Sequence, residues 1–256
     1  IVSAYWSPLF PPWSNQCLET SRRNGLCIVM NENPRDAWSL KGNVALISIG
    51  DGISGSVLAG ALAEAGADIA VAGSDHEAVL SAAGAMTATG RRVLRLLGDF
   101  DTPGSAKEAV RMTVNQLGGL DILVNASQIE LGKPFLDNSA KDWRNLLSVN
   151  VEAVLSRCQA AGRHMVEQRA GRIVNVISGL SERGLVDAVA YSATQGALQQ
   201  VTRSLALEWA RNGVRVNAIA TGWFENERRS VEEQQKELLV RYLPLRRKGH
   251  PADIGE

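Results

Sequence analysis

The residues of this chain that are best suited to chemistry lie between Ser178 and Gln195. Ser178 follows the apolar run Arg172–Ile177, and Tyr191 opens a stretch in which apolar residues recur every three or four positions, as in a helix. Tyr191 and Gln195 are four residues apart, so they share one helix face. A hydroxyl at the carboxyl end of a strand, beside a tyrosine in the first turn of the next helix, suits acid–base work on a C–O bond.

A second pattern, nearer the start of the chain, predicts the element that would hold a nucleotide. Asn43–Ile49 is a continuous apolar run, typical of a parallel strand covered on both faces. Gly50, Gly52 and Gly55 follow it, and then come a helical stretch and a second apolar run, Asp68–Ala72. Glycines in this context let the backbone approach a pyrophosphate at the helix N-terminus. We therefore expect a dinucleotide site here; a tight turn without a ligand is the alternative.

Together these patterns resemble the short-chain dehydrogenase/reductase family. Its members carry a serine, a tyrosine thirteen residues later and a lysine four residues after that; Ser178 and Tyr191 match, but Gln195 holds the lysine position. The resemblance implies hydride transfer between a nicotinamide cofactor and a carbonyl or secondary alcohol. Tyr191 would protonate the forming alkoxide, and Ser178 would hydrogen-bond the same oxygen. Asn150 would support a proton-relay water, although a purely structural amide within its helix is the alternative.

Gln195 is the departure with the largest consequence. A lysine charge about 5 Å from the tyrosine oxygen, at an effective dielectric near 20, stabilises tyrosinate by roughly 3 kcal/mol, or about two pKa units. Gln195 can hydrogen-bond a ribose, but it cannot supply that charge. We expect an oxidoreductase slowed in both directions, because both directions share one transition state. The alternatives are a catalytically silent protein that binds dinucleotide or partners an active subunit, and a decaying product that scarcely folds alone.

The resemblance also assigns cofactor contacts, with departures from the family pattern. Only Gly55 stays in register with the family's glycine motif, and Asp51 puts a carboxylate near the expected phosphates. Asn125 matches a strand-end asparagine, but the flexible glycine that follows in the family is lost. Asp99 falls where the family's aspartate contacts adenine; a solvated loop carboxylate is the equal alternative.

The choice between NAD and NADP stays open. The two positions that discriminate them in the family fall on Gly73 and Ser74, which carry no charge. Asp75 could reach a ribose hydroxyl. We favour the other interpretation, in which the run from Ser74 to Glu77 is a capping box that starts a helix.

By similarity, the fold is α/β: a Rossmann-type, doubly wound parallel sheet forming a single domain over residues 37–256. The family continues past Pro251–Glu256 with a helix and a seventh strand, so we expect the last strand to be missing and the sixth, Val214–Ile219, to have an uncovered edge. Residues 1–36 are Pro-rich and without sustained periodicity. We expect them to be an irregular or non-native extension; a dimer-capping arm is the alternative.

Composition sets broader bounds. The chain has 256 residues and a formal net charge of zero, which gives no global field to recruit nucleic acid or an anionic membrane. No apolar run approaches the ~20 residues of a spanning helix. Three cysteines at unrelated spacings predict neither a disulfide framework nor a metal site. A soluble protein of the reducing cytoplasm is the expectation.

The resemblance implies a small carbonyl or alcohol substrate and a homodimer or hetero-oligomer. Pairing would use the fourth and fifth expected helices, which contain Trp143–Cys158 and Tyr191–Trp209. Trp223 and Phe224 are expected to line the substrate pocket, with core packing as the alternative. Their surroundings, Ala218–Phe224, are similar to gluconate-type and 3-oxoacyl-type members, but the fold does not choose a substrate.

Overall fold

The computed structural model describes residues 38–50, 53–225, 230–235, 240–241 and 243–255. The chain divides into two units, Ile1–Ser39 and Leu40–Glu256, and the second carries everything discussed below. The expected N-terminal extension, residues 1–36, lies outside the described residues. Asp51 and Gly52, from the expected glycine turn, also lie outside them.

The core of the second unit is one parallel sheet of six strands, in the order β3-β2-β1-β4-β5-β6. β1 is buried along its whole length, as its unbroken apolar sequence requires. The four apolar runs identified in the sequence become β1, β2, β5 and β6, with ends shifted by at most two residues. The strands are β1 (Val44–Ser48), β2 (Asp68–Gly73), β3 (Val93–Leu97), β4 (Ile122–Asn125), β5 (Gly171–Ser178) and β6 (Val214–Thr221).

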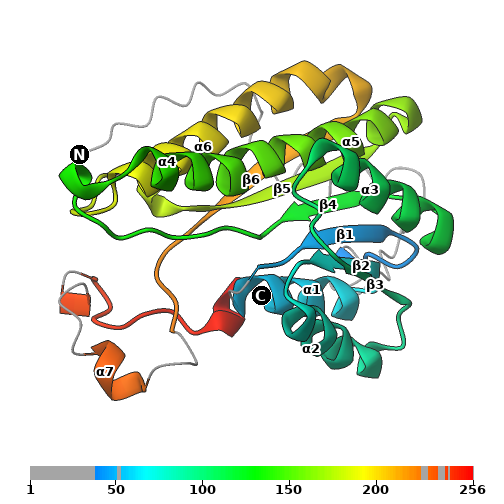
Figure 1. Cartoon of the computed structure of the whole chain (residues 1–256). Coiled ribbons are helices and arrows are strands. Elements are labelled where there is room, and N and C mark those ends of the chain that lie inside the picture. The colour runs from blue at the N-terminus through cyan, green and yellow to red at the C-terminus, as the bar shows by residue number, and fades with distance from the viewer. Residues whose placement is uncertain (1–37, 51–52, 226–229, 236–239, 242, 256) are drawn as a thin grey trace, which may run out of the picture. The chain divides into compact units, whose positions relative to one another are not determined.

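Helices cover both faces of this sheet (Figure 1). Val44 and Leu46 of β1 pack towards α3, α5 and α6, whereas Ala45 and Ile47 pack towards α1 and α2. The alternation follows from the two-residue period of a strand and confirms the doubly wound α/β fold. The helices are α1 (Ile53–Glu64), α2 (His76–Met86), α3 (Pro103–Leu117), α4 (Ala140–Leu147), a π-helical turn (Ser148–Glu152), α5 (Ala153–Gln168), α6 (Val189–Trp209) and α7 (Val231–Gln235), with short 3-10 turns at Thr87–Thr89, Phe135–Asp137, Gly179–Ser181, Ala210–Asn212 and Pro251–Ile254. No helix in the described part of the chain combines the length and apolar character that crossing a membrane requires.

β6 forms the edge of the sheet within the described residues. Val214 and Val216 are buried, but the alternate residues Arg215 and Asn217 are exposed. One side of β6 therefore packs on the core while its other side faces solvent.

The strand order reverses direction at β1, which lies between β2 and β4. In open α/β sheets, ligands bind beyond the carboxyl ends of the strands at such a reversal. Ser48 and Asn125 end β1 and β4 opposite each other. Just beyond them the Ser127 hydroxyl donates to the Ser48 hydroxyl over 3.3 Å, so the two strand ends are joined at this point.

Candidate active site

Ser178 and Tyr191 meet at the carboxyl edge of the sheet. Ser178 is the last residue of β5, and its Oγ accepts from the Leu180 backbone N–H over 3.2 Å. Tyr191 lies in the first turn of α6, is 5% exposed, and packs against Leu180 and Ala188. The Ser178 side chain lies near enough to the Tyr191 hydroxyl to lower the pKa of the phenol. The structure thus brings the predicted pair together.

Burial dominates the electrostatics of Tyr191. Desolvation raises the pKa of its phenol well above the ordinary value, and the negative charge of Glu130 raises it further, while the Ser178 side chain acts in the opposite direction. The hydroxyl therefore keeps its proton at neutral pH. In this state Tyr191 is a proton donor.

The Tyr191 hydroxyl has a second partner that the sequence analysis missed. It donates to Gln128 Oε1 over 3.3 Å. Gln128 lies just after β4, at the position where the family motif has a glycine. The replacement of that glycine was the only feature of the sequence that could have drawn attention to Gln128. A Cβ on Gly50 would be 3.6 Å from the Gln128 backbone nitrogen, so the predicted cofactor residue Gly50 lies beside it.

Gln195 has no exposed surface and is committed to protein partners. Its Oε1 accepts from the Ser178 backbone N–H over 2.8 Å, and its Nε2 donates to Thr194 Oγ1 over 3.4 Å. The side chain therefore ties α6 to the end of β5. Because Gln195 has no exposed surface, its predicted contact with a ribose stays a prediction.

Asn150 is fully buried in the π-helical turn, Ser148–Glu152, that interrupts the long helix. Its Oδ1 accepts from the Ile129 backbone N–H over 2.9 Å, and its Nδ2 donates to the Ile129 carbonyl over 2.9 Å and to Thr194 Oγ1 over 3.2 Å. These bonds join the loop after β4 to α6 and give the structural interpretation direct support. A water held by Asn150 stays a prediction.

Gly55 is required by close packing between α1 and the end of β1. A Cβ at this position would lie 2.6 Å from Ile49 Cγ2, closer than side chains tolerate. Gly73 is similarly confined, because its Cβ would lie 2.8 Å from the Ile49 carbonyl oxygen. Tight helix–strand packing is the role of the third glycine in a dinucleotide fingerprint.

Asp75 and Asp99 both bond to their own segments. Asp75 Oδ1 accepts from the Ala78 backbone N–H over 3.0 Å and caps α2. The cap interpretation was therefore right in kind, but Asp75 rather than Ser74 is the capping residue. Asp99 Oδ1 accepts from the Asp101 backbone N–H over 2.9 Å and shapes the loop after β3. Asp99 as an adenine ligand stays a prediction.

The Asn125 side chain points into the protein interior. Its Oδ1 accepts from Arg157 Nε over 2.9 Å, and its Nδ2 donates to Asn175 Oδ1 over 2.8 Å. Arg157 also pairs with Asp101, which connects α5 to the loop after β3. Because these bonds occupy the Asn125 amide, a contact with a cofactor would fall to its backbone.

Trp223 lies beside Tyr191, whereas Phe224 does not pack against Tyr191 or its apolar neighbours. Trp223 packs against the cluster of Leu180, Ala188 and Tyr191. Its carbonyl accepts from the Gly249 backbone N–H over 2.9 Å, whereas the Phe224 ring lies over Gly249. Trp223 is therefore the residue that can form a substrate wall.

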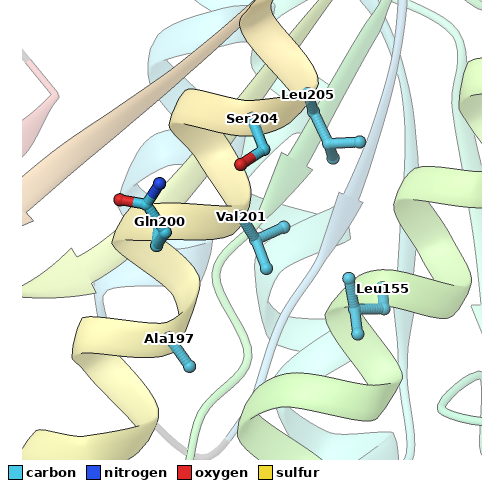
Figure 2. Close-up of a pocket in the computed structure, with 6 residues that line it drawn as sticks. All are labelled: Leu155, Ala197, Gln200, Val201, Ser204 and Leu205. Atoms are coloured by element: carbon cyan, nitrogen blue, oxygen red, sulfur yellow. The ribbon is translucent and has the colours of Figure 1, made fainter. Parts of the chain in front are cut away.

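A separate hollow of about 330 Å³ lies between α5 and α6, away from these residues (Figure 2). Its lining is almost entirely apolar and consists of Leu155, Ala197, Gln200, Val201, Ser204 and Leu205. Among the described residues, no group of three or more His, Cys, Asp or Glu side chains is placed to hold a metal ion.

Comparison with known proteins shows what the chain is similar to. A sequence model of the short chain dehydrogenases matches residues 43–237. Gluconate 5-dehydrogenase of Gluconobacter oxydans is 32% identical over 222 residues, covering 86% of this chain and 87% of that protein.

Solved structures agree with the sequence match. A gluconate 5-dehydrogenase from Burkholderia cenocepacia, in complex with NADP and tartrate, is 30% identical with a TM-score of 0.78, covering 87% of this chain and 89% of that one. An NAD⁺-bound xylitol dehydrogenase is 27% identical with a TM-score of 0.78, covering 84% and 90%.

Proposed function

The chain belongs to the short-chain dehydrogenase family, and from that membership we propose that it binds NAD or NADP and transfers hydride between the nicotinamide and a small carbonyl or alcohol substrate. The observation that carries the proposal is the placement of Ser178, at the carboxyl end of β5, next to the buried Tyr191 in the first turn of α6. Both cofactors have precedent among the relatives, since one solved neighbour holds NADP and another NAD⁺.

The described residues fit a dinucleotide in part. Gly55 lets α1 approach β1 closely, which brings the helix N-terminus to the expected pyrophosphate position. Gly50 lies next to Gln128, where the strand order reverses. We propose Gly50, Gly52, Gly55 and Asp99 as the cofactor side of the site, with Asn125 contributing through its backbone. When bound, the nicotinamide would donate or accept the hydride.

The protein's own residues would manage the proton. In the reductive direction Tyr191, which is neutral at physiological pH, donates its proton to the carbonyl oxygen. Ser178 hydrogen-bonds the same oxygen and positions it. Leu180, Ala188 and Trp223 keep water from this side of the reacting atoms.

We further propose that catalysis is weakened relative to a lysine-containing relative. Gln195 provides no charge near Tyr191, and its amide holds the Ser178 backbone instead. The absent charge corresponds to roughly 3 kcal/mol of tyrosinate stabilisation. The Tyr191–Gln128 hydrogen bond is the specific observation that favours the second candidate, a silent protein that binds dinucleotide or an active partner subunit.

Calorimetric titration of the chain with NADH and NADPH, paired with a carbonyl-reduction screen of the parent and Tyr191→Phe, tests this proposal. Binding, with turnover that Tyr191→Phe abolishes, is the expected result. Binding without turnover in the parent would favour the silent protein. Absence of binding to both dinucleotides would overturn the assignment.

For the assembly, we propose a dimer or hetero-oligomer paired through the helical layer that contains α5 and α6. The open apolar hollow between these helices supports the proposal, because a partner helix would cover it (Figure 2). We also propose that the functional unit begins near residue 37, which agrees with the division of the chain after Ser39. A cytoplasmic location stays a prediction.

A further inference from the structure

Arg183 lies in the segment that connects Ser178 to Tyr191. Its guanidinium carbon lies 5.1 Å from the centroid of the Trp223 ring, a cation–π distance. Its Nη2 would be 3.6 Å from a Cβ added to Gly179, the residue that follows Ser178. Trp223 itself packs against the cluster of Leu180, Ala188 and Tyr191, so Arg183 lies over a ring that borders Tyr191.

The charge of Arg183 is not neutralised by a carboxylate in the described part of the chain, where no ion pair includes it. Its neighbour Glu182 is engaged elsewhere: Oε1 accepts from Gln199 Nε2 over 2.7 Å and lies 4.0 Å from Arg203 Nη2. Arg183 is also exposed. Its guanidinium N–H groups can therefore donate hydrogen bonds to a ligand that binds near Ser178 and Tyr191.

The charges around Tyr191 differ between the two neighbouring loops. Glu130, in the loop after β4, acts on Tyr191 with a negative charge. Arg183, in the segment after β5, presents a positive one. A substrate carboxylate would be repelled from the Glu130 side and attracted to the Arg183 side, and this difference would orient an anionic substrate in the site.

We propose that Arg183, which lies over the Trp223 ring, binds the carboxylate of the substrate, so that the chain acts on small hydroxy or oxo acids. The inference rests on the proposed oxidoreductase function and adds a substrate class to it. A guanidinium can form two parallel hydrogen bonds with a carboxylate. A neutral carbonyl or alcohol of the same shape would gain nothing from it.

The test compares acids with matched neutral ligands. D-gluconate, tartrate and their primary amides are titrated calorimetrically into the parent, Arg183→Gln, Arg183→Lys and Arg172→Gln, each saturated with whichever dinucleotide binds the parent. Arg172 is an exposed arginine at the opposite end of β5 and serves as the matched control.

We expect Arg183→Gln to weaken binding of the acid by about 10- to 100-fold and to leave binding of the amide and the dinucleotide unchanged. Arg183→Lys should retain part of the affinity, and Arg172→Gln all of it. The inference is overturned if dinucleotide binds but no acid binds better than its amide, or if Arg183→Gln affects acid and amide equally. Failure of the parent to bind dinucleotide would instead overturn the proposed function.

Discussion

The properties of the Tyr191 hydroxyl depend on two glutamines. Gln195 removes a positive charge that family members place nearby, and Gln128 adds a hydrogen-bond acceptor where they have a glycine. Both changes favour the protonated phenol, in the same direction as burial. The tyrosine therefore keeps its proton at neutral pH, but its raised pKa makes it a weaker acid, so proton transfer is slowed in both directions.

Alcohol oxidation by this chain should therefore depend strongly on pH. Oxidation needs tyrosinate, and the pKa of Tyr191 is raised, so kcat/KM should keep increasing with pH through the alkaline range without a plateau. In Gln195→Lys the added charge lowers the pKa of the phenol by about two units, so the rise should level off at a lower pH. Rate profiles from pH 6 to 11 measure this, and Gln195→Met is the neutral control. Superimposable profiles for the lysine and methionine variants would refute the electrostatic explanation.

Gln128→Gly should accelerate carbonyl reduction by about 2- to 10-fold. The hydrogen bond from Tyr191 to Gln128 Oε1 must break before the proton passes to a substrate, and such a bond contributes about 0.5–1.5 kcal/mol. Single-turnover rates at saturating dinucleotide measure the change, and Gln128→Glu, which keeps an acceptor, should show no gain. A slower Gln128→Gly with an unchanged melting temperature would show that Gln128 assists the reaction.

Among single residues, sequence spacing was sufficient to predict the contact between Ser178 and Tyr191, because strand and helix periodicity fix their positions. Gln128 and Arg183 were missed. Their roles arise from contacts across the fold, Gln128 with Tyr191 and Arg183 with Trp223. For the same reason, the internal partners of Gln195 could not be predicted.

At the scale of elements, the junction of β1 and α1 is the most constrained contact near the expected cofactor. Gly55→Ala should destabilise the fold by about 1–3 kcal/mol, because its Cβ would lie 2.6 Å from Ile49 Cγ2. Gly60 in the same helix has no atom within 4 Å of an added Cβ, so Gly60→Ala should stabilise it by about 0.5–1 kcal/mol. Urea unfolding of both variants measures the difference. Equal effects would contradict the packing argument.

Strands β1, β2, β5 and β6 were predictable from the sequence, because each is a short apolar run between turn residues. The hydrogen bonds at the ends of the helices were harder to predict from the sequence than the strands. Asp75 replaces Ser74 as the cap of α2, since its carboxylate reaches the Ala78 N–H. The residue pattern around Asn150 is that of an ordinary helix and does not indicate the π-helical turn.

At the scale of the whole molecule, the apolar hollow between α5 and α6 should be covered by a partner. Leu205→Glu places a charge in its lining and should convert a dimer to monomer, as measured by sedimentation equilibrium. Leu207→Glu is the control, because Leu207 is 83% exposed and is not part of the lining. Dissociation by both variants, or by neither, would contradict pairing through this hollow.

The doubly wound topology was predictable because the chain resembles the family over Leu40–Glu256, and the resemblance implies the strand order and the placement of the helices. The chemistry of the site was predictable only in outline, since no sequence pattern states which amide faces which hydroxyl. The expected extension at residues 1–36 and the expected loss of a seventh strand stay predictions.

The rate of carbonyl reduction by Gln195→Lys, compared with the parent at saturating dinucleotide, tests the central claim most directly. We claim that a reaction site of the short-chain dehydrogenase type is present and lacks one charge. Restoring about 3 kcal/mol should raise the rate about 100-fold, with an unchanged melting temperature as the control for folding. A lysine variant that folds and binds dinucleotide, but reduces no faster than the parent, would contradict the claim.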